Sequence, residues 1–347
     1  MRRRVPAVLF AISIAAGAFA QTAPAPAQDA PSAELPTVVV SGEQPGPGLW
    51  KVSSNAHVLW ILGTLSPLPK SMAWRSKQVE DVIAESQAVL EPPRLKVHAD
   101  IGFWGKLRLL PSLVGVRDNP DHATLKQVVP PDLYARWLDL KTKYIGRDRG
   151  RNLETWRPIF AALELYDAAI RKTDLTRSDI TGDIVHNAAK RAGIEPTTLA
   201  ITLEVDDPHG AVKEFKDSDM HDLECFRKTL DRIDSDVSTM AARANAWATA
   251  DLDALRKLPD SDLRAVCFAA VMNTELARER GITDVDARLK KAWTDAAAAT
   301  LAKNAVSFAR LPIDDLLATD GYLAKLRALG YAIESPDATS SDAADTP

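Results

Sequence analysis

The chain has 347 residues, a formal net charge of −4, and 46% hydrophobic and 26% charged residues, which is ordinary for a folded protein. This composition excludes a disordered chain, a collagen-like chain and a disulfide-stapled miniprotein. The length fits about two domains or one large α/β domain. The acidic balance argues against a general nucleic-acid binder, because phosphate binding needs a basic surface.

Residues 1–20 are predicted to be a secretory signal peptide. Three arginines precede an apolar run, and Ala18 and Ala20 supply the small residues that signal peptidase needs. The alternative is an N-terminal anchor helix, but the run is shorter than the roughly 18 residues that a span needs. We therefore expect a periplasmic or secreted protein without a transmembrane helix after cleavage. The mature chain would hold 40 Lys and Arg against 47 Asp and Glu.

Residues 21–47 are predicted to be a linker, since they contain six of the 22 prolines and favour extended, solvated backbone. Within it, residues 35–42 (Leu-Pro-Thr-Val-Val-Val-Ser-Gly) resemble the short strand by which outer-membrane receptors engage TonB. The segment from Thr37 to Val40 is thus either a docking strand for a partner or a chance β-branched run. Residues 336–347 form a polar tail, which leaves 48–335 as the folded part.

The first elements of the folded part predict a parallel arrangement. Residues 49–52 and 57–62 are two strands about a small turn, and 74–88 have the spacing of a helix. A short buried strand at 88–90 follows, ending at Glu91 before Pro92 and Pro93. Strand, helix and strand in this order favour a parallel sheet with crossover connections.

The rest of the chain is rich in predicted helix. A helical insertion is expected around 118–192, with segments at 133–144, 156–173 and 180–192. A strand at 197–205 contains Glu204 near its end. Further helices are expected at 220–248, 262–279, 284–303 and 322–328, the last ended by Gly330, with strands at 305–308 and 331–333. The predicted fold class is α/β, with a central mixed sheet flanked by helices. Ligands in such sheets bind at the carboxyl ends of the strands.

The expected helix at 220–248 carries apolar residues that alternate in steps of three and four, which is a heptad seam. The seam comprises Leu223, Phe226, Leu230, Ile233, Val237, Met240, Ala244 and Trp247. Two interpretations stay open. The seam either packs against helices of the same chain or forms a coiled coil in a homodimer.

The two cysteines, Cys225 and Cys267, are predicted to form a disulfide. Export places them in an oxidising compartment, where an even count favours a bridge. Distances along the expected helices leave a mismatch of about two helical turns. Two buried free thiols therefore remain the alternative.

Residues 63–76 carry a family resemblance. Gly63, Thr64, Leu68 and Pro69, followed by Trp-Arg-Ser at 74–76 and an amphipathic helix, resemble the TraB/GumN family, which includes TIKI-type metal-dependent proteases. The last segment is similar too, with Asp-Gly-Tyr-Leu at 320–323 and Gly-Tyr at 330–331 after a strand. The resemblance covers roughly residues 47–335.

The resemblance implies a divalent metal held by two Gly-x-x-His motifs and acidic residues. In this chain both histidines are missing: the first falls on Ser66 and the second near Asp315. The Arg-Asn pair expected before Trp293 reads Leu-Lys. Two acids stand at matching places, Glu91 and Glu204. The candidate catalytic residues are therefore Glu91, Glu204, Ser66 and Asp315, and the candidate metal ligands are Glu91, Glu204 and Asp314.

The missing imidazoles weaken the expected metal chemistry. Imidazole suits Zn, Mn or Co, whereas an all-oxygen site suits Mg or Ca. The cofactor is thus either a divalent cation or none. Three functions stay open: a catalytically degenerate envelope protein that binds a protein or peptide ligand, an active hydrolase with a rebuilt carboxylate site, and a structural or assembly protein of the envelope.

A basic segment stands apart from these motifs. Lys143, Arg147, Arg149 and Arg151 surround two glycines and form either a solvated loop or an anion-binding rim. The sequence has no Gly-x-Ser-x-Gly elbow, Walker loop or dinucleotide fingerprint, which disfavours lipase-like, NTPase and NAD-dependent functions.

Overall fold

A computed structural model describes residues 43–147, 149–234, 236–258, 263–272, 274, 277–278 and 282–336. The predicted signal peptide, most of the predicted linker with its segment from Thr37 to Val40, and the tail from residue 337 lie outside these residues. The strands are β1 Leu49–Ser54, β2 His57–Thr64, β3 Leu68–Pro69, β4 Val89–Leu90, β5 Arg94–His98, β6 Leu175–Thr176, β7 Ala200–Glu204, β8 Val306–Pro312 and β9 Ala332–Glu334.

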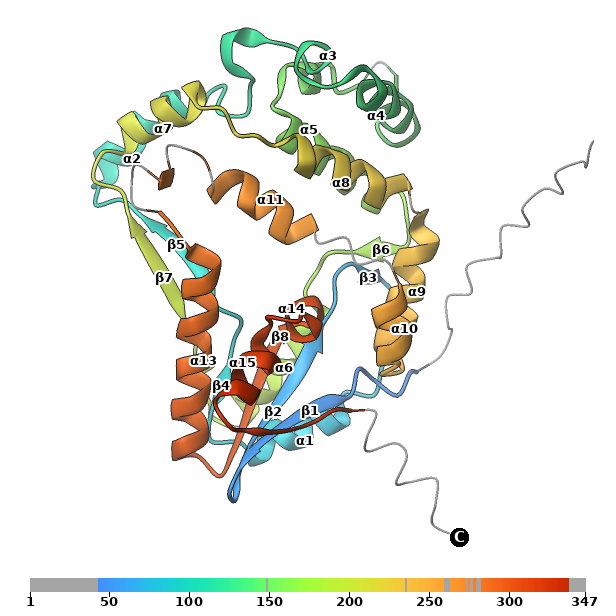
Figure 1. Ribbon diagram of the computed structural model, residues 1–347, viewed down its shortest axis with the longest axis vertical. Coiled ribbons are helices and arrows are strands. Elements are labelled where there is room, and N and C mark those ends of the chain that lie inside the picture. Colours follow the sequence, from blue (N-terminus) through green and yellow to red (C-terminus); the bar gives the residue numbers. More distant parts are fainter. Residues whose placement is uncertain are drawn as a thin grey trace, which may run out of the picture. The chain divides into compact units, whose positions relative to one another are not determined.

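Helices account for most of the remaining structure (Figure 1). The α-helices are α1 Lys77–Glu85, α2 Phe103–Leu109, α3 Leu125–Val128, α4 Pro131–Tyr144, α5 Pro158–Arg171, α6 Ile180–Arg191, α7 Pro208–Asp217, α8 Leu223–Asp234, α9 Asp236–Ala248, α10 Leu252–Lys257, α11 Leu263–Met272, α13 Val285–Lys303, α14 Ile313–Leu317 and α15 Tyr322–Ala328. Three 3₁₀ turns are η1 Leu110–Leu113, η2 Pro120–His122 and η3 Arg151–Thr155. Among the described helices, none combines the length and the apolar character needed to cross a bilayer.

The central sheet has the strand order β4-β8-β2-β1-β9. Strands β2 and β4 both run parallel to β8, whereas β1 pairs antiparallel with β2 and β9. The sheet is therefore mixed, as expected. The predicted hairpin and the β2-α1-β4 crossover are confirmed, and the C-terminal glycine, Gly330, follows α15 in a left-handed conformation with a φ of 89°.

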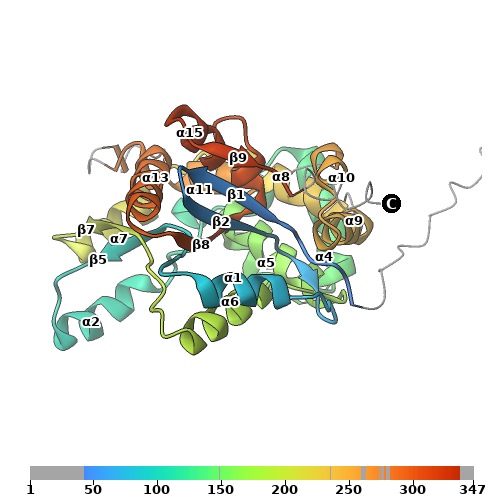
Figure 2. The ribbon, with the colours of Figure 1, turned by 90° about the horizontal axis from the view of Figure 1, so that it is seen from below.

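Helices cover both faces of this sheet. Figure 2 shows α1 and α6 on one side of the sheet and α13 and α15 on the other. The buried face of α1 contributes Val79 and Ile83, and α13 contributes Trp293 and Leu301 to the same core. Helix α6 belongs to this core through Val185 and not to the helical insertion to which the sequence assigned it.

A second core lies between helices. It joins apolar residues of α3, α4 and α5 to Phe226, Leu230 and Ile233 of α8. The single helix expected at 220–248 is two helices, α8 and α9. The described seam residues divide between two cores, because Ala244 and Trp247 of α9 pack into the sheet core. Except for Leu223, which is 38% exposed, these residues are buried within one chain, and a homodimeric coiled coil stays a prediction.

The expected disulfide between Cys225 and Cys267 is present. It joins α8 to α11, with Cα atoms 4.7 Å apart. The two cysteines meet because α11 packs against α8. The sequence predicts one long helix here, whereas α8 and α9 run in different directions (Figure 1). Cys225 is fully buried beside Ile159 and Met220.

Strands β5 and β7 form a separate parallel ladder. The segment at 197–205 was expected to join the central sheet. Within the described residues, it pairs with that sheet only at Thr197, which forms an isolated bridge with Leu90 of β4. Beyond this point the paired segments continue as β5 and β7 alongside α2, η1 and α7 (Figure 1), where η1 contacts α7. We refer to residues 94–117 and 200–217 as the arm.

The fold begins before the expected boundary at residue 48. Gln44 is buried, its N–H donates to the carbonyl of Ala73, and its carbonyl accepts from Arg75. The N–H of Gly46 donates to the carbonyl of Ala248. The last residues of the predicted linker are therefore anchored on the fold by backbone hydrogen bonds, which composition does not reveal.

Candidate functional site

The parallel strands bring three of the predicted site residues to one edge of the sheet. Thr64 at the end of β2 pairs with Pro312 at the end of β8, so Ser66 and Asp314 each follow that register by two residues. Glu91 directly follows β4, whose last residue pairs with Ala309 of β8. This carboxyl edge is where ligands bind in open α/β sheets.

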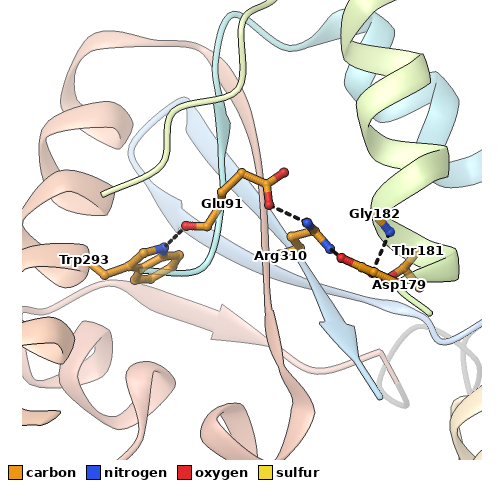
Figure 3. Close-up of polar contacts among 6 residues, drawn as sticks. All are labelled: Glu91, Asp179, Thr181, Gly182, Trp293 and Arg310. Atoms are coloured by element: carbon orange, nitrogen blue, oxygen red, sulfur yellow. Dashed lines mark hydrogen bonds and ion pairs between the residues drawn. The ribbon is translucent and has the colours of Figure 1, made fainter. Parts of the chain in front are cut away.

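Glu91 lies in an ion cluster with an arginine that the sequence analysis did not select (Figure 3). The Nε and Nη2 atoms of Arg310 both lie 2.6 Å from Oε2 of Glu91, and both side chains are 9% exposed. The Nη1 atom of Arg310 also donates to Asp179. Asp179 is the N-cap of α6 and accepts from the N–H of Gly182 at 2.8 Å. Trp293 of α13 donates to the backbone carbonyl of Glu91 at 3.1 Å.

The electrostatics of this cluster favour its charged form. Burial lowers the pKa of Arg310, but the hydrogen bonds that Arg310 donates to Glu91 and Asp179 outweigh that effect, and the pKa is raised. Burial likewise works to raise the pKa of Asp179, but the hydrogen bond and charge of Arg310 dominate and hold the pKa below its usual value. The guanidinium is therefore a permanent cation between two carboxylates.

A second arginine forms an ion pair with Asp314, the other predicted metal ligand at this edge. Arg243 of α9 is buried and forms an ion pair with Asp314 in the first turn of α14. Asp315 is half-buried. A Cβ atom added to Gly321 would lie only 2.1 Å from the backbone carbonyl oxygen of Asp315. A side chain there would meet backbone, so Gly321 in the Asp-Gly-Tyr segment serves close packing of α14 against the start of α15.

Two predicted residues have a different setting. Glu204 is exposed at the end of β7, opposite His98 of β5. Seven residues separate Thr197, which pairs beside Glu91, from Glu204, and an extended chain of that length spans roughly 20 Å. The structure therefore does not bring Glu204 to Glu91. Ser66 is exposed at the sheet edge.

The implied metal can be tested against these donors. The carboxylates of Glu91 and Asp314 are each paired with a buried guanidinium, and Glu204 is remote. Within the described residues, no three His, Cys, Asp or Glu side chains are grouped closely enough to hold a metal ion. A divalent cation bound to Glu91 at this edge would lie beside the guanidinium of Arg310. Two positive charges so close together repel strongly in a site of low dielectric constant. The residues present do not fit the metal.

The basic segment lines a cavity in the helical part. The cavity has a volume of about 530 Å³ and is lined by Tyr144, Leu153 and Trp156 together with Arg149, Arg171 and Lys172. The Nζ atom of Lys172 donates to the carbonyl of Lys143, and Arg171 pairs with Glu164 at 3.0 Å. Glu164 also lines the cavity, so its three cations exceed its one carboxylate by two charges. Aromatic walls and this positive excess suit a ligand with an apolar body and a negative charge.

Three functional residues escaped the sequence analysis, namely Arg310, Asp179 and Arg243. A signal existed for two of them. Arg310 is a lone charge in an otherwise apolar strand, which predicts a buried partner, and Asp179 precedes a helical pattern at an N-cap position. Arg243 lies among alanines on a helix with no comparable signal.

The comparisons with known proteins agree with the residues that carry the resemblance. The model of the TraB/PrgY/gumN family matches residues 48–335. No curated protein and no solved structure gives a significant match. The match covers the sheet with its core, the second core between helices, and the carboxyl edge with its paired arginines. On this extent the chain belongs to the TraB/PrgY/gumN family.

Proposed function

We propose that this chain is an exported, non-hydrolytic member of its family that binds a ligand in the cell envelope. The single observation that carries the loss of hydrolysis is the position of Arg310 between Glu91 and Asp179. A metal-dependent hydrolase needs a cation with an open coordination position for water. A guanidinium supplies positive charge, but it does not coordinate water as a Lewis acid. It therefore cannot lower the pKa of a bound water molecule as a metal ion does.

Export is supported by two features. The first is the signal-like pattern of residues 1–20, and the second is the bridge between Cys225 and Cys267, since disulfides persist in oxidising compartments. Both features are compatible with a periplasmic or a secreted protein.

The cavity between α4, η3 and α5 is the proposed binding site. Its volume of about 530 Å³ lies within the range of sites for small ligands. Arg149, Arg171 and Lys172 would bind a carboxylate, while Tyr144 and Trp156 would contact an apolar or aromatic body. A peptide that ends in a free carboxylate after an aromatic side chain has both features.

The first test concerns hydrolysis. The chain from residue 21 onward should contain well under one equivalent of divalent metal and should show no peptidase activity with added Mn²⁺ or Co²⁺. Ser66→His alone should not restore activity, because Arg310 still occupies Glu91. Turnover by the natural chain that is abolished by Glu91→Gln would overturn the proposal and favour a hydrolase with a rebuilt carboxylate site.

The second test concerns binding. Calorimetry with N-acetylphenylalanine and with its uncharged amide isolates the carboxylate. We expect the acid to bind at least tenfold more tightly, and Arg149→Gln with Lys172→Gln to remove that preference, because charge-assisted hydrogen bonds contribute about 1.5–3 kcal/mol each. Lys126→Gln, an exposed lysine of α3 that does not line the cavity, is the matched control. Equal binding of acid and amide would contradict an anion site.

A further inference from the structure

The arm carries a concentrated apolar surface. Seven of the ten large hydrophobic side chains that are exposed in the described part of the chain lie between residues 97 and 114. Phe103 is 73% exposed, Trp104 71% and Val114 75%. The full set, which we call the α2 surface, comprises Val97, Phe103, Trp104, Leu107, Leu110, Leu113 and Val114. Contiguous exposed apolar surface of this kind marks an interaction site.

Packing among the residues that the structure describes does not account for this surface. Helix α2 has no buried residue, and its two aromatic rings contact each other with centroids 5.5 Å apart. The segment is attached through η1, which contacts α7, and the Ser112 hydroxyl lies 3.1 Å from Nδ1 of His209. Burial of these large apolar side chains against another surface is favourable, because it removes them from water.

The charge of the segment identifies the kind of surface. Residues 101–117 contain Lys106, Arg108 and Arg117 and no acidic residue, in a chain whose net charge is −4. The acids at or beyond the ends of β5 and β7 are Asp100, Glu204, Asp206 and Asp207, and helix α7 of the arm adds Glu214 and Asp217. Helix α2 itself therefore presents aromatic and basic side chains together.

We infer that α2 and η1 lie in the interface of an anionic phospholipid bilayer. Tryptophan and phenylalanine enter the headgroup region, while lysine and arginine extend to the lipid phosphates. The seven-residue helix is about 10 Å long, so it lies on the bilayer and does not cross a core of about 30 Å.

A second copy of the chain is the less favourable occupant. In a two-fold dimer the same patch meets itself, which would bring Lys106 and Arg108 of both copies together without acidic partners on α2. An anionic lipid surface attracts the same two residues. This inference does not rest on the proposed ligand cavity or on the loss of hydrolysis.

Flotation with vesicles tests the inference. The chain from residue 21 onward is mixed with vesicles of phosphatidylcholine alone or of phosphatidylcholine with 30% phosphatidylglycerol. We expect binding to the anionic vesicles, a loss of binding at high salt, and at least tenfold weaker binding to the neutral vesicles. Phe103→Ser with Trp104→Ser should weaken binding at least tenfold, and so should Lys106→Glu with Arg108→Glu.

Matched substitutions elsewhere serve as controls. Leu329→Ser replaces a side chain that is 55% exposed but lies outside the arm, and Lys126→Glu with Lys303→Glu makes the same charge change on α3 and α13. Both should bind like the unchanged chain. No flotation with either vesicle, or equal flotation with both, would overturn the inference. So would a concentration-dependent dimer that Phe103→Ser and Trp104→Ser dissociate in the absence of vesicle binding, which would assign the α2 surface to a second copy.

Discussion

The carboxyl edge of the sheet and the arm differ in which side chains they bury: charged side chains are buried at the sheet edge, whereas large apolar side chains are exposed on the arm. At the sheet edge, the charged side chains of Glu91, Arg310 and Arg243 are buried, and Glu91 and the half-exposed Asp314 are each paired with one of these arginines. On the arm, large apolar groups are exposed and α2 buries none of its residues. The comparison indicates that the sheet edge is closed by internal contacts, whereas the arm keeps a surface for external ones.

The comparison predicts the largest effect for Arg310→Met. This substitution leaves Glu91 buried without its cation, which costs about 3–5 kcal/mol of unfolding free energy. Urea denaturation followed by circular dichroism measures the loss. Adding Glu91→Leu should recover most of the stability, because an apolar pair of similar volume replaces the ion pair. A loss below about 1 kcal/mol for Arg310→Met would mean that Glu91 reaches water and that the sheet edge is not closed.

The next largest effect is expected for the disulfide that joins helices α8 and α11. Cys225 and Cys267 are 42 residues apart, and the chain-entropy estimate for a loop of this size is about 4 kcal/mol. Cys225→Ala with Cys267→Ala should lower the free energy of unfolding by up to that amount. The reference is the unsubstituted chain with and without reductant, where reduction should reproduce most of the loss. A variant as stable as the oxidised chain would show that α8 and α11 are held by packing alone.

Sequence reasoning reached the elements of the sheet because their signals are local. Alternating apolar residues, a small turn near Asn55 and the β-α-β order are sufficient for the β1-β2 hairpin and the parallel direction of β2 and β4. That β8 lies between these two strands was not predicted. The strand at 200–204 was assigned to the wrong sheet, since its composition does not show which partner it pairs with. The β5 strand was missed although residues 94–98 alternate polar and apolar side chains, and α2 was missed because its apolar residues do not form a buried face.

The candidate site was predicted in part for the same reason. Glu91 and Asp314 follow strands, which the sequence shows, and the sheet register brings them to one edge. Their partners come from far along the chain: Arg310 is 219 residues from Glu91, and Arg243 is 71 residues from Asp314. Whether a carboxylate meets a metal or a guanidinium depends on such long-range packing, which residue type and spacing do not encode.

A smaller, pH-dependent effect is expected at Asp179, the exposed end of the ion cluster. The pKa of the folded state lies below that of the unfolded state. The stabilisation from the charge is therefore complete above the unfolded pKa of about 3.9 and is lost as the pH falls through the folded pKa. Asp179→Asn should cost about 0.5–1 kcal/mol at pH 7, since the side chain is 55% exposed, and progressively less as the pH falls through the folded pKa.

The N-cap role of Asp179 provides the control for this effect. Asparagine retains the acceptor for the N–H of Gly182, whereas Asp179→Ala removes it and should cost about 1 kcal/mol more at both pH values. Thermal unfolding at pH 7 and at pH 2 separates the two contributions. A cost of Asp179→Asn that does not change with pH would indicate that the ion pair with Arg310 contributes nothing.

The smallest effect is expected on the arm, and it decides whether the comparison holds. Phe103→Ser with Trp104→Ser should change the free energy of unfolding by less than about 0.5 kcal/mol, because both side chains are more than 70% exposed and serine has a similar helix propensity. Trp293→Ala, at a fully buried tryptophan of the sheet core, is the matched contrast and should cost about 3–5 kcal/mol. Urea denaturation of both variants without lipid gives the two values. If the arm variant lost more than about 1 kcal/mol, Phe103 and Trp104 would be packing against the fold in solution. The α2 surface would then be part of the core of the chain, and no external partner would be needed to explain its composition.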